Sequence, residues 1–207
     1  MRRTPSKSLL LISKKVGNRP LDTQFLDRAI EYAVHAHAGT ERRGKGFPYV
    51  IHPLEAMAIV ATMTADQEIL AAAVLHDVVE DTDITIDEIR TEFGDRVARL
   101  VDSESDRKLE LVDWRARKEE SLKRLSFASR EEKIVALGDK LSNMRAIARD
   151  YTTRGDDSFW ELFHIKEKSV HSWRYHALVD ALSSLADTYA YQEFRYLVNS
   201  IFPEEML

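Results

Sequence analysis

The segment LAAAVLHDVVEDT, residues 70–82, ends an apolar run in a cluster of ionisable side chains. His76, Asp77, Glu80 and Asp81 follow directly after AAAVL. Such groups are costly to bury unless something compensates their charge. A histidine beside carboxylates is a typical ligand set for a divalent transition metal. The segment therefore favours metal chemistry, with further ligands supplied from elsewhere in the chain.

Two more polar groups lie on apolar segments far along the sequence. Asp139 belongs to IVALGDKLSNMR, residues 134–145, and His52 stands where a glycine-rich loop meets an expected helix start. One cation would explain both of them together with His76 and Asp77. Two imidazoles and two carboxylates suit Mn²⁺, Fe²⁺ or Zn²⁺ better than Ca²⁺.

Each of these residues also has an ordinary structural explanation. His52 precedes a proline and could cap a helix, and Asp139 could form a surface ion pair with Lys140. A histidine followed by an aspartate is common and by itself indicates nothing. The combination of three polar groups on three apolar segments is what favours a metal site.

Helices must position these side chains, because helical periodicity recurs along the chain while strand signals are almost absent. We predict an all-α fold, a single-domain bundle of about nine helices. Residues 39–53, GTERRGKGFPYVIHP, contain three glycines and two prolines and should form a loop, with Pro53 in the first turn of the next helix. The expected helices span residues 22–38, 53–63, 66–80, 84–93 with 97–101, 114–127, 130–149, 158–166, 169–187 and 190–201.

The composition excludes several classes of protein. With 207 residues, 44% hydrophobic and 31% charged, the chain is an ordinary globular sequence. A net charge of -5 argues against a nucleic-acid partner, and no apolar run is long enough to cross a membrane. The absence of cysteine excludes disulfides and a thiolate zinc site.

The N-terminal segment is basic and does not have the features of a secretory signal. Its apolar part, LLLI, is too short, and two lysines follow closely. We expect residues 1–20 to be a mobile tail, residues 21–207 to form the domain, and the protein to be cytoplasmic.

The chain resembles the HD superfamily of metal-dependent phosphohydrolases. More specifically, it is similar to the hydrolase domain of RelA/SpoT homologues, which include small stand-alone alarmone hydrolases and the metazoan SpoT homologue. The resemblance covers residues from about 23 to 202 and is carried by AHAGTERRGKGFPYVIHP, LAAAVLHDVVEDT, LVDSESDRK, GDKLSNMR and HSWRYHAL. It implies an HD-type helical bundle with one Mn²⁺, or Fe²⁺ or Zn²⁺ in its place. The implied reaction removes pyrophosphate from the 3′ position of ppGpp or pppGpp, leaving GDP or GTP.

The resemblance also implies roles for individual side chains. Four of them would be metal ligands: His52, His76, Asp77 and Asp139. Two carboxylates would act on the attacking water: Glu80 and Asp81. Such a carboxylate can take a proton as general base, while the metal lowers the pKa of water.

Substrate contacts are expected from a basic loop and from two later residues. Arg42 and Arg43 match a basic pair that contacts phosphates, and arginine can grip a phosphate in a bidentate way. Asn143 matches a residue near the nucleotide. We add Lys45, a cation on the same loop, and Tyr175, whose aromatic face could stack on a base.

Three features depart from the family pattern. Arg43 stands where lysine is usual, and Gly138 stands where alanine is frequent and should weaken its helix modestly. The large bifunctional members carry a synthetase domain after the hydrolase. We expect this chain of 207 residues only to degrade alarmone.

Two other functions remain open from the sequence. The same chemistry could act on another nucleotide, such as the 2′-phosphate of NADPH or a nucleoside triphosphate. Alternatively, the fold could serve as a non-catalytic nucleotide sensor. We expect guanosine tetraphosphate or pentaphosphate as the substrate, and we expect neither nucleic-acid nor membrane partners. The oligomeric state is not predicted.

Overall fold

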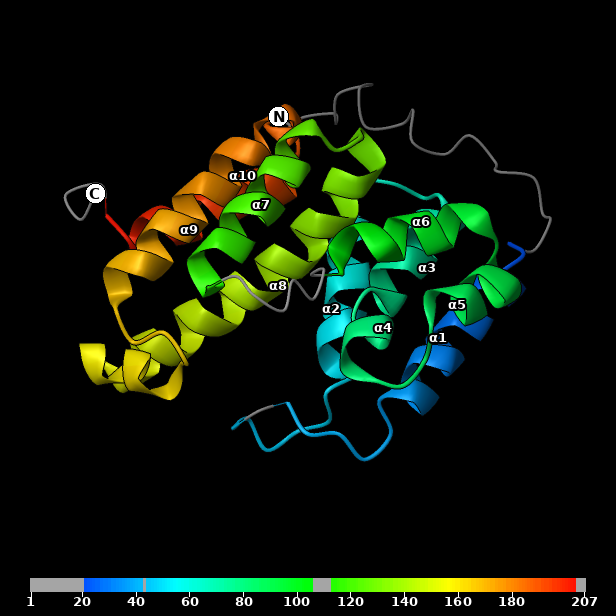
Figure 1. Cartoon of the computed structure of the whole chain (residues 1–207), viewed down its shortest axis with the longest axis horizontal. Coiled ribbons are helices and arrows are strands. Elements are labelled where there is room, and N and C mark those ends of the chain that lie inside the picture. Colours follow the sequence, from blue (N-terminus) through cyan, green and yellow to red (C-terminus); the bar gives the residue numbers. More distant parts are fainter. Residues whose placement is uncertain (1–20, 43, 106–112, 204–207) are drawn as a thin grey trace, which may run out of the picture.

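The computed structural model describes residues 21–42, 44–105 and 113–203. Within these ranges the chain forms helices and no strand, apart from one isolated bridge between Glu41 and Pro48 (Figure 1). The all-α prediction is confirmed, whereas the tail predicted for residues 1–20 lies outside the described part. No helix in these ranges has both the length and the apolar character needed to cross a bilayer.

Ten α-helices and two 3-10 helices make up the described part. They are α1 (Gln24–Ala36), α2 (Ile51–Val60), α3 (Gln67–Leu75), α4 (Val78–Asp81), α5 (Ile86–Phe93), α6 (Asp95–Glu104), α7 (Trp114–Phe127), α8 (Arg130–Arg154), η2 (Asp157–Leu162), α9 (Lys168–Ala181), η3 (Ser183–Leu185) and α10 (Tyr189–Ile201).

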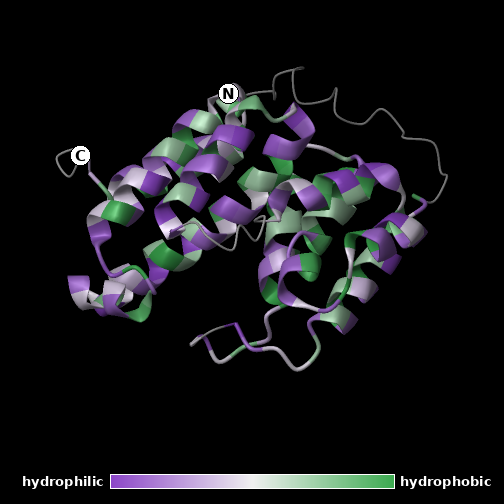
Figure 2. Cartoon of the chain, in the orientation of Figure 1, coloured by the Kyte–Doolittle hydropathy of each residue, from purple (hydrophilic) through white to green (hydrophobic). Residues whose placement is uncertain are grey.

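The long helix α8 is the centre of the arrangement. It packs against α2, α3 and α6 on one side and against α10 on another, while α7 and α9 lie together (Figure 1). Apolar residues concentrate on the faces turned inward, where they form one continuous core (Figure 2). The elements predicted to hold the metal ligands, α2, α3 and α8, therefore meet in the middle of the bundle.

Helix α8 begins and ends at residues whose local chemistry fixes its length. Ser129 and Glu132 form a reciprocal capping box at its start. It continues to Arg154, five residues beyond the predicted end at residue 149, and stops at Gly155 with φ of 81°. Glycine adopts this left-handed conformation without the usual steric penalty.

The helix predicted for residues 66–80 is divided at the His76–Asp77 pair into α3 and α4. The ring nitrogen Nδ1 of His76 donates to the carbonyl of Ala73 at 2.8 Å. In a continuous α-helix this carbonyl would accept from the backbone N–H of Asp77. The imidazole takes its place, so the prediction of one uninterrupted helix is wrong at the two residues that matter most.

Two further helix predictions are wrong in type or extent. Residues 158–166 were expected to be α-helical, but the structure has the 3-10 helix η2, which buries Phe159 and Trp160. The helix expected over residues 169–187 ends at Ala181 and is followed by η3, with Leu182 and Leu185 both buried. A spacing of three between buried residues fits either helix type, so the apolar pattern could not separate them.

Close packing between α8 and α2 explains why position 138 is a glycine, although glycine has a low helix propensity. A Cβ added there would lie 2.7 Å from Cγ2 of Val60 and 2.8 Å from the carbonyl oxygen of Ala56. The missing side chain thus lets α8 approach the backbone of α2 closely. That approach brings Asp139, the next residue on α8, toward His52 on α2.

Gly138→Ala should destabilise the fold. Overpacking against a backbone atom costs about 1–3 kcal/mol, which exceeds the gain of up to about 1 kcal/mol in helix propensity. Urea unfolding of the variant should therefore show a lower midpoint. Adding Val60→Ala should recover only part of the loss, since the Ala56 carbonyl remains in place. A variant as stable as the wild type would mean that α2 and α8 can separate freely.

Candidate metal centre and substrate cavity

Three nitrogen and oxygen donors converge where α2 meets the α3–α4 junction. The Nε2 atoms of His52 and His76 lie 3.5 Å and 3.1 Å from Oδ2 of Asp77, and these ligand atoms all lie within 4.8 Å of one another. Both histidines are almost fully buried. The structure therefore brings together three of the four predicted ligands as a compact group.

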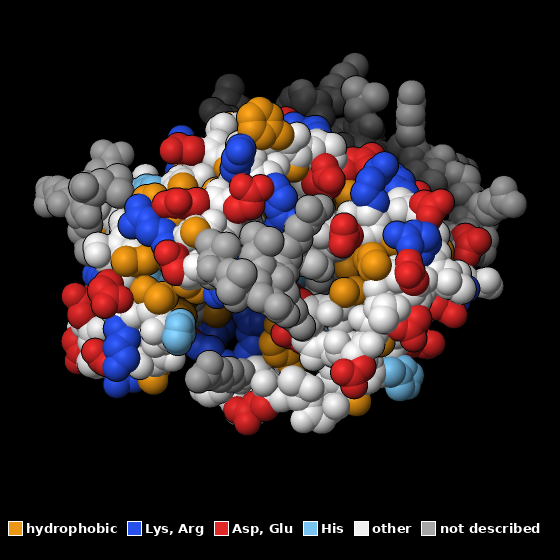
Figure 3. All heavy atoms as spheres, in the orientation of Figure 1, with side chains coloured by type: hydrophobic (Ala, Val, Ile, Leu, Met, Phe, Trp, Pro, Cys, Tyr) orange, Lys and Arg blue, Asp and Glu red, His pale blue; other side chains and the backbone are white. Residues whose placement is uncertain are grey.

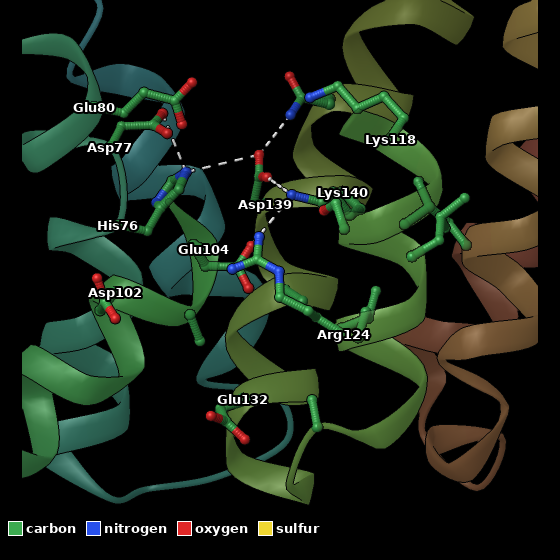
Figure 4. Close-up of a pocket in the computed structure, with 18 of the residues that line it drawn as sticks. His76, Asp77, Glu80, Asp102, Glu104, Lys118, Arg124, Glu132, Asp139 and Lys140 are labelled. Atoms are coloured by element: carbon green, nitrogen blue, oxygen red, sulfur yellow. Dashed lines mark hydrogen bonds and ion pairs between the residues drawn. The ribbon is translucent and has the colours of Figure 1, made fainter. Parts of the chain in front are cut away.

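Asp139, the fourth predicted ligand, reaches the same point from α8. Its Oδ1 lies 3.1 Å from Nε2 of His52 and 3.7 Å from Nε2 of His76. Asn143 donates to this oxygen, and Lys140 contacts the other carboxylate oxygen (Figure 4). One carboxylate oxygen of Asp139 thus faces the two imidazoles, and the other contacts the Lys140 ammonium.

The charges in this cluster compensate one another. Burial alone would raise the pKa of Asp77, but the neighbouring His76 outweighs it and lowers the pKa to about 2. Burial alone would lower the pKa of His76, but Asp77 and Asp139 outweigh it and raise the pKa well above its ordinary value. Burial likewise opposes ionisation of Asp139, yet the Lys140 ammonium holds the pKa of Asp139 well below its usual range.

The donor set fits a divalent metal. Nε2 of His76 is buried and has no hydrogen bond of normal geometry within the described part of the chain, although it points at carboxylate oxygens. Two imidazole nitrogens with carboxylate oxygens are ligands that Mn²⁺, Fe²⁺ and Zn²⁺ accept, and the residues do not choose among these ions. A cation here would bind to His52, His76 and Asp77, with Asp139 adjacent.

Lys140 is not part of a surface ion pair, as one structural explanation of Asp139 supposed. Its ammonium contacts Asp139 and lies 3.2 Å from Oε2 of Glu104, whose side chain is only 7% exposed. Burial would lower the pKa of Lys140, but these two carboxylates raise it, so the residue stays charged. A partly buried cation therefore adjoins the candidate metal centre (Figure 4).

The two acids after the cluster lie at its open side. Glu80 and Asp81 are exposed, in contrast to His76 and Asp77, and this agrees with the predicted order of depth. Glu80 lies beside Asp77 at the cavity wall (Figure 4). Asp81 is not among the described residues that line the cavity, and its carboxylate is close to the Tyr49 hydroxyl.

A cavity of about 670 Å³ opens over the centre, between α6, α7 and α8. His52, His76, Asp77 and Asp139 lie in its wall. In the space-filling view, the surface of the molecule has a hollow with Lys and Arg side chains at its bottom, on the side of the loop that precedes α2 (Figure 3). The cations among the described lining residues are Arg42, Arg99, Lys118, Lys123, Arg124, Lys140 and Arg174.

A second cavity of about 250 Å³ adjoins the first. The two cavities share Arg42, Lys140, Asn143, Arg174 and Leu178 in their walls. The far wall of the second is largely aromatic and consists of Phe159, Phe163, His171 and Tyr175.

The predicted substrate contacts separate between these two cavities. Arg42 donates to Oδ1 of Asn143 at 2.6 Å, so both lie in the shared wall. Lys45 and Tyr175 line only the second cavity among the described residues, and Lys45 is paired with Asp150. Arg43 lies outside the described residues.

Several residues of the site were not predicted from the sequence. The Tyr49 hydroxyl donates to Oδ2 of Asp77 at 2.7 Å and so orients a predicted ligand. Ser142 lies 2.8 Å from Nδ1 of His52. Spacing carried a signal for Ser142, which is three residues after Asp139 on α8 and therefore on the same helical face. Tyr49 lies in the turn before α2, and its spacing carried no such signal.

The metal-free protein should lose stability as pH rises. The folded-state pKa of His76 is raised above its ordinary value of 6.5, so its ion pairs stabilise fully below that pH and are lost as pH rises through the folded-state pKa. Urea unfolding with a chelator should show a falling free energy of unfolding on the alkaline side. His76→Gln should flatten this slope.

Adding Mn²⁺ should reverse the trend, because a metal binds the neutral imidazole and its affinity grows with pH. The same alkaline slope in wild type and His76→Gln would contradict the assignment of this effect to His76.

Comparisons with known proteins agree with the fold. A family model described as "HD domain" matches residues 29–165, which is more than half of the chain. A "guanosine-3′,5′-bis(diphosphate) 3′-pyrophosphohydrolase" of Aquifex aeolicus is 34% identical over 139 residues, 66% of this chain and 20% of that protein. A Vibrio cholerae protein of the same name is 40% identical over 130 residues, 60% of this chain and 18% of that protein.

Solved structures match over more of the chain. A metazoan SpoT orthologue described as hydrolysing ppGpp superposes with a TM-score of 0.66 at 24% identity, covering 92% of this chain and 100% of that one. The Listeria monocytogenes protein lmo0812 gives a TM-score of 0.67 at 28% identity, covering 74% and 99%. The chain spans about one-fifth of the length of the curated relatives named above. It belongs to the HD domain family and is related within it to the RelA/SpoT ppGpp hydrolase domain.

Proposed function

We propose that this protein is a metal-dependent hydrolase that removes the 3′-pyrophosphate of ppGpp and pppGpp, giving GDP or GTP and pyrophosphate. The observation that carries the proposal is the His52, His76 and Asp77 cluster at the wall of a cavity that also presents cationic side chains. The choice of substrate rests on similar proteins that are named for this reaction. The choice of a metal-dependent hydrolysis rests on the residues that line the cavity.

The metal centre is assigned to four side chains: His52, His76, Asp77 and Asp139. Mn²⁺ is our proposed ion. When bound, such a cation polarises a phosphoryl oxygen and lowers the pKa of water. Tyr49 holds the Asp77 carboxylate by a hydrogen bond of 2.7 Å, which keeps one of its oxygens oriented.

Glu80 is our candidate for the acid–base group. It lines the cavity beside Asp77, and its exposure leaves it accessible to water. The water oxygen bonds to the phosphorus attached to the 3′ oxygen, and the bond from that phosphorus to the 3′ oxygen breaks. Glu80 takes the proton from the attacking water and returns it to the leaving 3′ oxygen. Asp81, the next residue, is the second member of the proposed acidic pair.

Cationic side chains offset the charge on the phosphates. Lys140 stays ionised between Asp139 and Glu104 at the edge of the centre. Arg42 and Arg174 line the wall that the two cavities share. Charge that develops on phosphoryl oxygens in the transition state is stabilised by such preorganised cations.

The second cavity suits the nucleoside end of the substrate. Its wall joins Tyr175 and other aromatic side chains to the amide of Asn143 and the ammonium of Lys45. Aromatic faces stack on bases, and a few polar groups then fix the orientation. The base of a nucleotide would fit the aromatic second cavity, and its phosphates would fit the first cavity with its cationic side chains.

With Mn²⁺ present, the protein should convert ppGpp to GDP and pyrophosphate. The measurement is a chromatographic product assay that compares ppGpp, NADPH, GTP and dGTP at equal concentration. ppGpp should be the preferred substrate of the four.

Each other outcome has a definite meaning. If ppGpp stays intact while NADPH or a triphosphate is cleaved, the proposed substrate is wrong, but the proposed metal-dependent hydrolysis stands. Tight nucleotide binding without turnover in any divalent metal would instead make the protein a sensor.

Asp77→Ala and Glu80→Gln should separate metal binding from proton transfer. Asp77→Ala removes a ligand and should lose both Mn²⁺ and activity. Glu80→Gln should keep Mn²⁺ while kcat falls by about 10²–10⁴-fold, the usual contribution of a general base. Metal content and kcat are measured on the same samples.

Glu120→Gln is the matched control, since Glu120 is another exposed glutamate in the wall of the same cavity. It should behave like the wild type. Equal metal loss in Asp77→Ala and Glu80→Gln would remove the division between ligand and acid–base group.

A further inference from the structure

A network of hydrogen bonds links the metal centre to two residues, Ser142 and Glu55, that are not among the described residues lining the cavity. Nδ1 of His52 lies 2.8 Å from Oγ of Ser142 on α8. The Ser142 hydroxyl in turn donates to Oε2 of Glu55 at 2.8 Å, and Glu55 lies one turn after His52 on α2. His52 and Ser142 are both buried, at 4% and 2% exposure.

The direction of each bond in this network follows from the number of protons available. The carboxylate of Glu55 can only accept, so the single hydroxyl proton of Ser142 is used there. The Ser142 oxygen must then accept from His52, and this requires the proton of the neutral imidazole to be on Nδ1. With a metal bound, Nε2 would then have its lone pair available for the ion, on the side of Asp77 and Asp139.

The Glu55 end of this hydrogen-bond network is connected to α10 through Arg145. Arg145 places Nη1 3.2 Å from Oε1 of Glu55, and it binds Glu193 through two hydrogen bonds of 2.7 Å each. A bidentate pair of this kind fixes the plane of the guanidinium as well as its position. The Glu55 side chain, which is 38% exposed, is thereby held between Ser142 and Arg145.

We propose that Ser142 and Glu55 are positioning residues, which hold the His52 imidazole in the tautomer and ring orientation that present Nε2 to a divalent metal. Neither residue touches the cavity in which hydrolysis is proposed. The inference rests on the proposed function only through the metal centre, and it does not depend on which nucleotide is the substrate.

A role in helix packing alone would not require this arrangement. The contact between α2 and α8 is already made by Gly138 against Val60 and the Ala56 backbone. A serine that merely filled space would need no partner, and Ser172 is such a residue: it is 0% exposed, and its hydroxyl has no hydrogen bond among the described residues. Ser172 is therefore a matched control for Ser142.

The test measures metal binding without any substrate. The Mn²⁺ dissociation constant is obtained from the electron paramagnetic resonance signal of free Mn²⁺. Ser142→Ala should weaken binding by about 10- to 100-fold, the usual effect of removing the partner of a ligating histidine. Ser142→Thr keeps the hydroxyl and should recover most of the affinity, and Glu55→Gln should remain close to wild type because its amide oxygen can accept the same hydrogen bond.

A second readout follows the ring proton itself. In the Zn²⁺-loaded protein, the Nδ1–H of His52 should give a slowly exchanging nuclear magnetic resonance signal, assigned by its absence in His52→Gln. Ser142→Ala should lose this signal through fast exchange with water. Ser172→Ala should keep both the signal and the Mn²⁺ affinity.

The outcomes separate the two proposals. Wild-type Mn²⁺ affinity in Ser142→Ala, or equal weakening in Ser142→Ala and Ser172→Ala, would overturn the positioning role and leave the metal centre intact. A wild-type protein that binds no divalent metal would overturn the metal centre and the positioning role together. Intact ppGpp in the presence of bound Mn²⁺ would affect only the substrate.

Discussion

Two carboxylates buried close to the same pair of imidazoles are the constraint around which this bundle is organised. Removing charges from water is costly, and it is tolerated only where opposite charges and hydrogen bonds replace the water. Asp139 is therefore backed by Lys140, and Asp77 accepts from Tyr49 and faces His76. The ammonium of Lys140 needs a second acid in turn, which explains a glutamate as enclosed as Glu104.

The helices can be understood as supports for that cluster. His52 comes from the first turn of α2, the His76–Asp77 pair from a junction, and Asp139 from the middle of α8. The ligand at the junction does not rely on regular helix geometry, because the imidazole of His76 itself occupies a backbone carbonyl. The close approach of α8 to α2 at Gly138 then joins the two halves. The local hydrogen bond of His76 and the packing of α8 against α2 thus both help to bring the side chains of this cluster together.

Much of this was predictable from the sequence, and the remainder depended on contacts that periodicity does not encode. Helix positions followed from apolar spacing. The cluster of His52, His76 and Asp77 followed from residue type and from the place of these residues at the ends of apolar segments. The break at His76 was missed because it depends on a side chain that competes with a backbone donor. Ser142 and Glu55 were missed because each looks like an ordinary polar residue until α2 and α8 are brought together.

The wall of Arg42, Lys140 and Asn143 that separates the two cavities has a consequence for release of products. A ligand long enough to occupy both cavities gains from effective concentration, since holding one end keeps the other end near its site. Bond cleavage near the shared wall would leave one fragment in each cavity and end that advantage. Both fragments would then dissociate more readily than the intact ligand, so turnover would not need a separate opening step to clear the site.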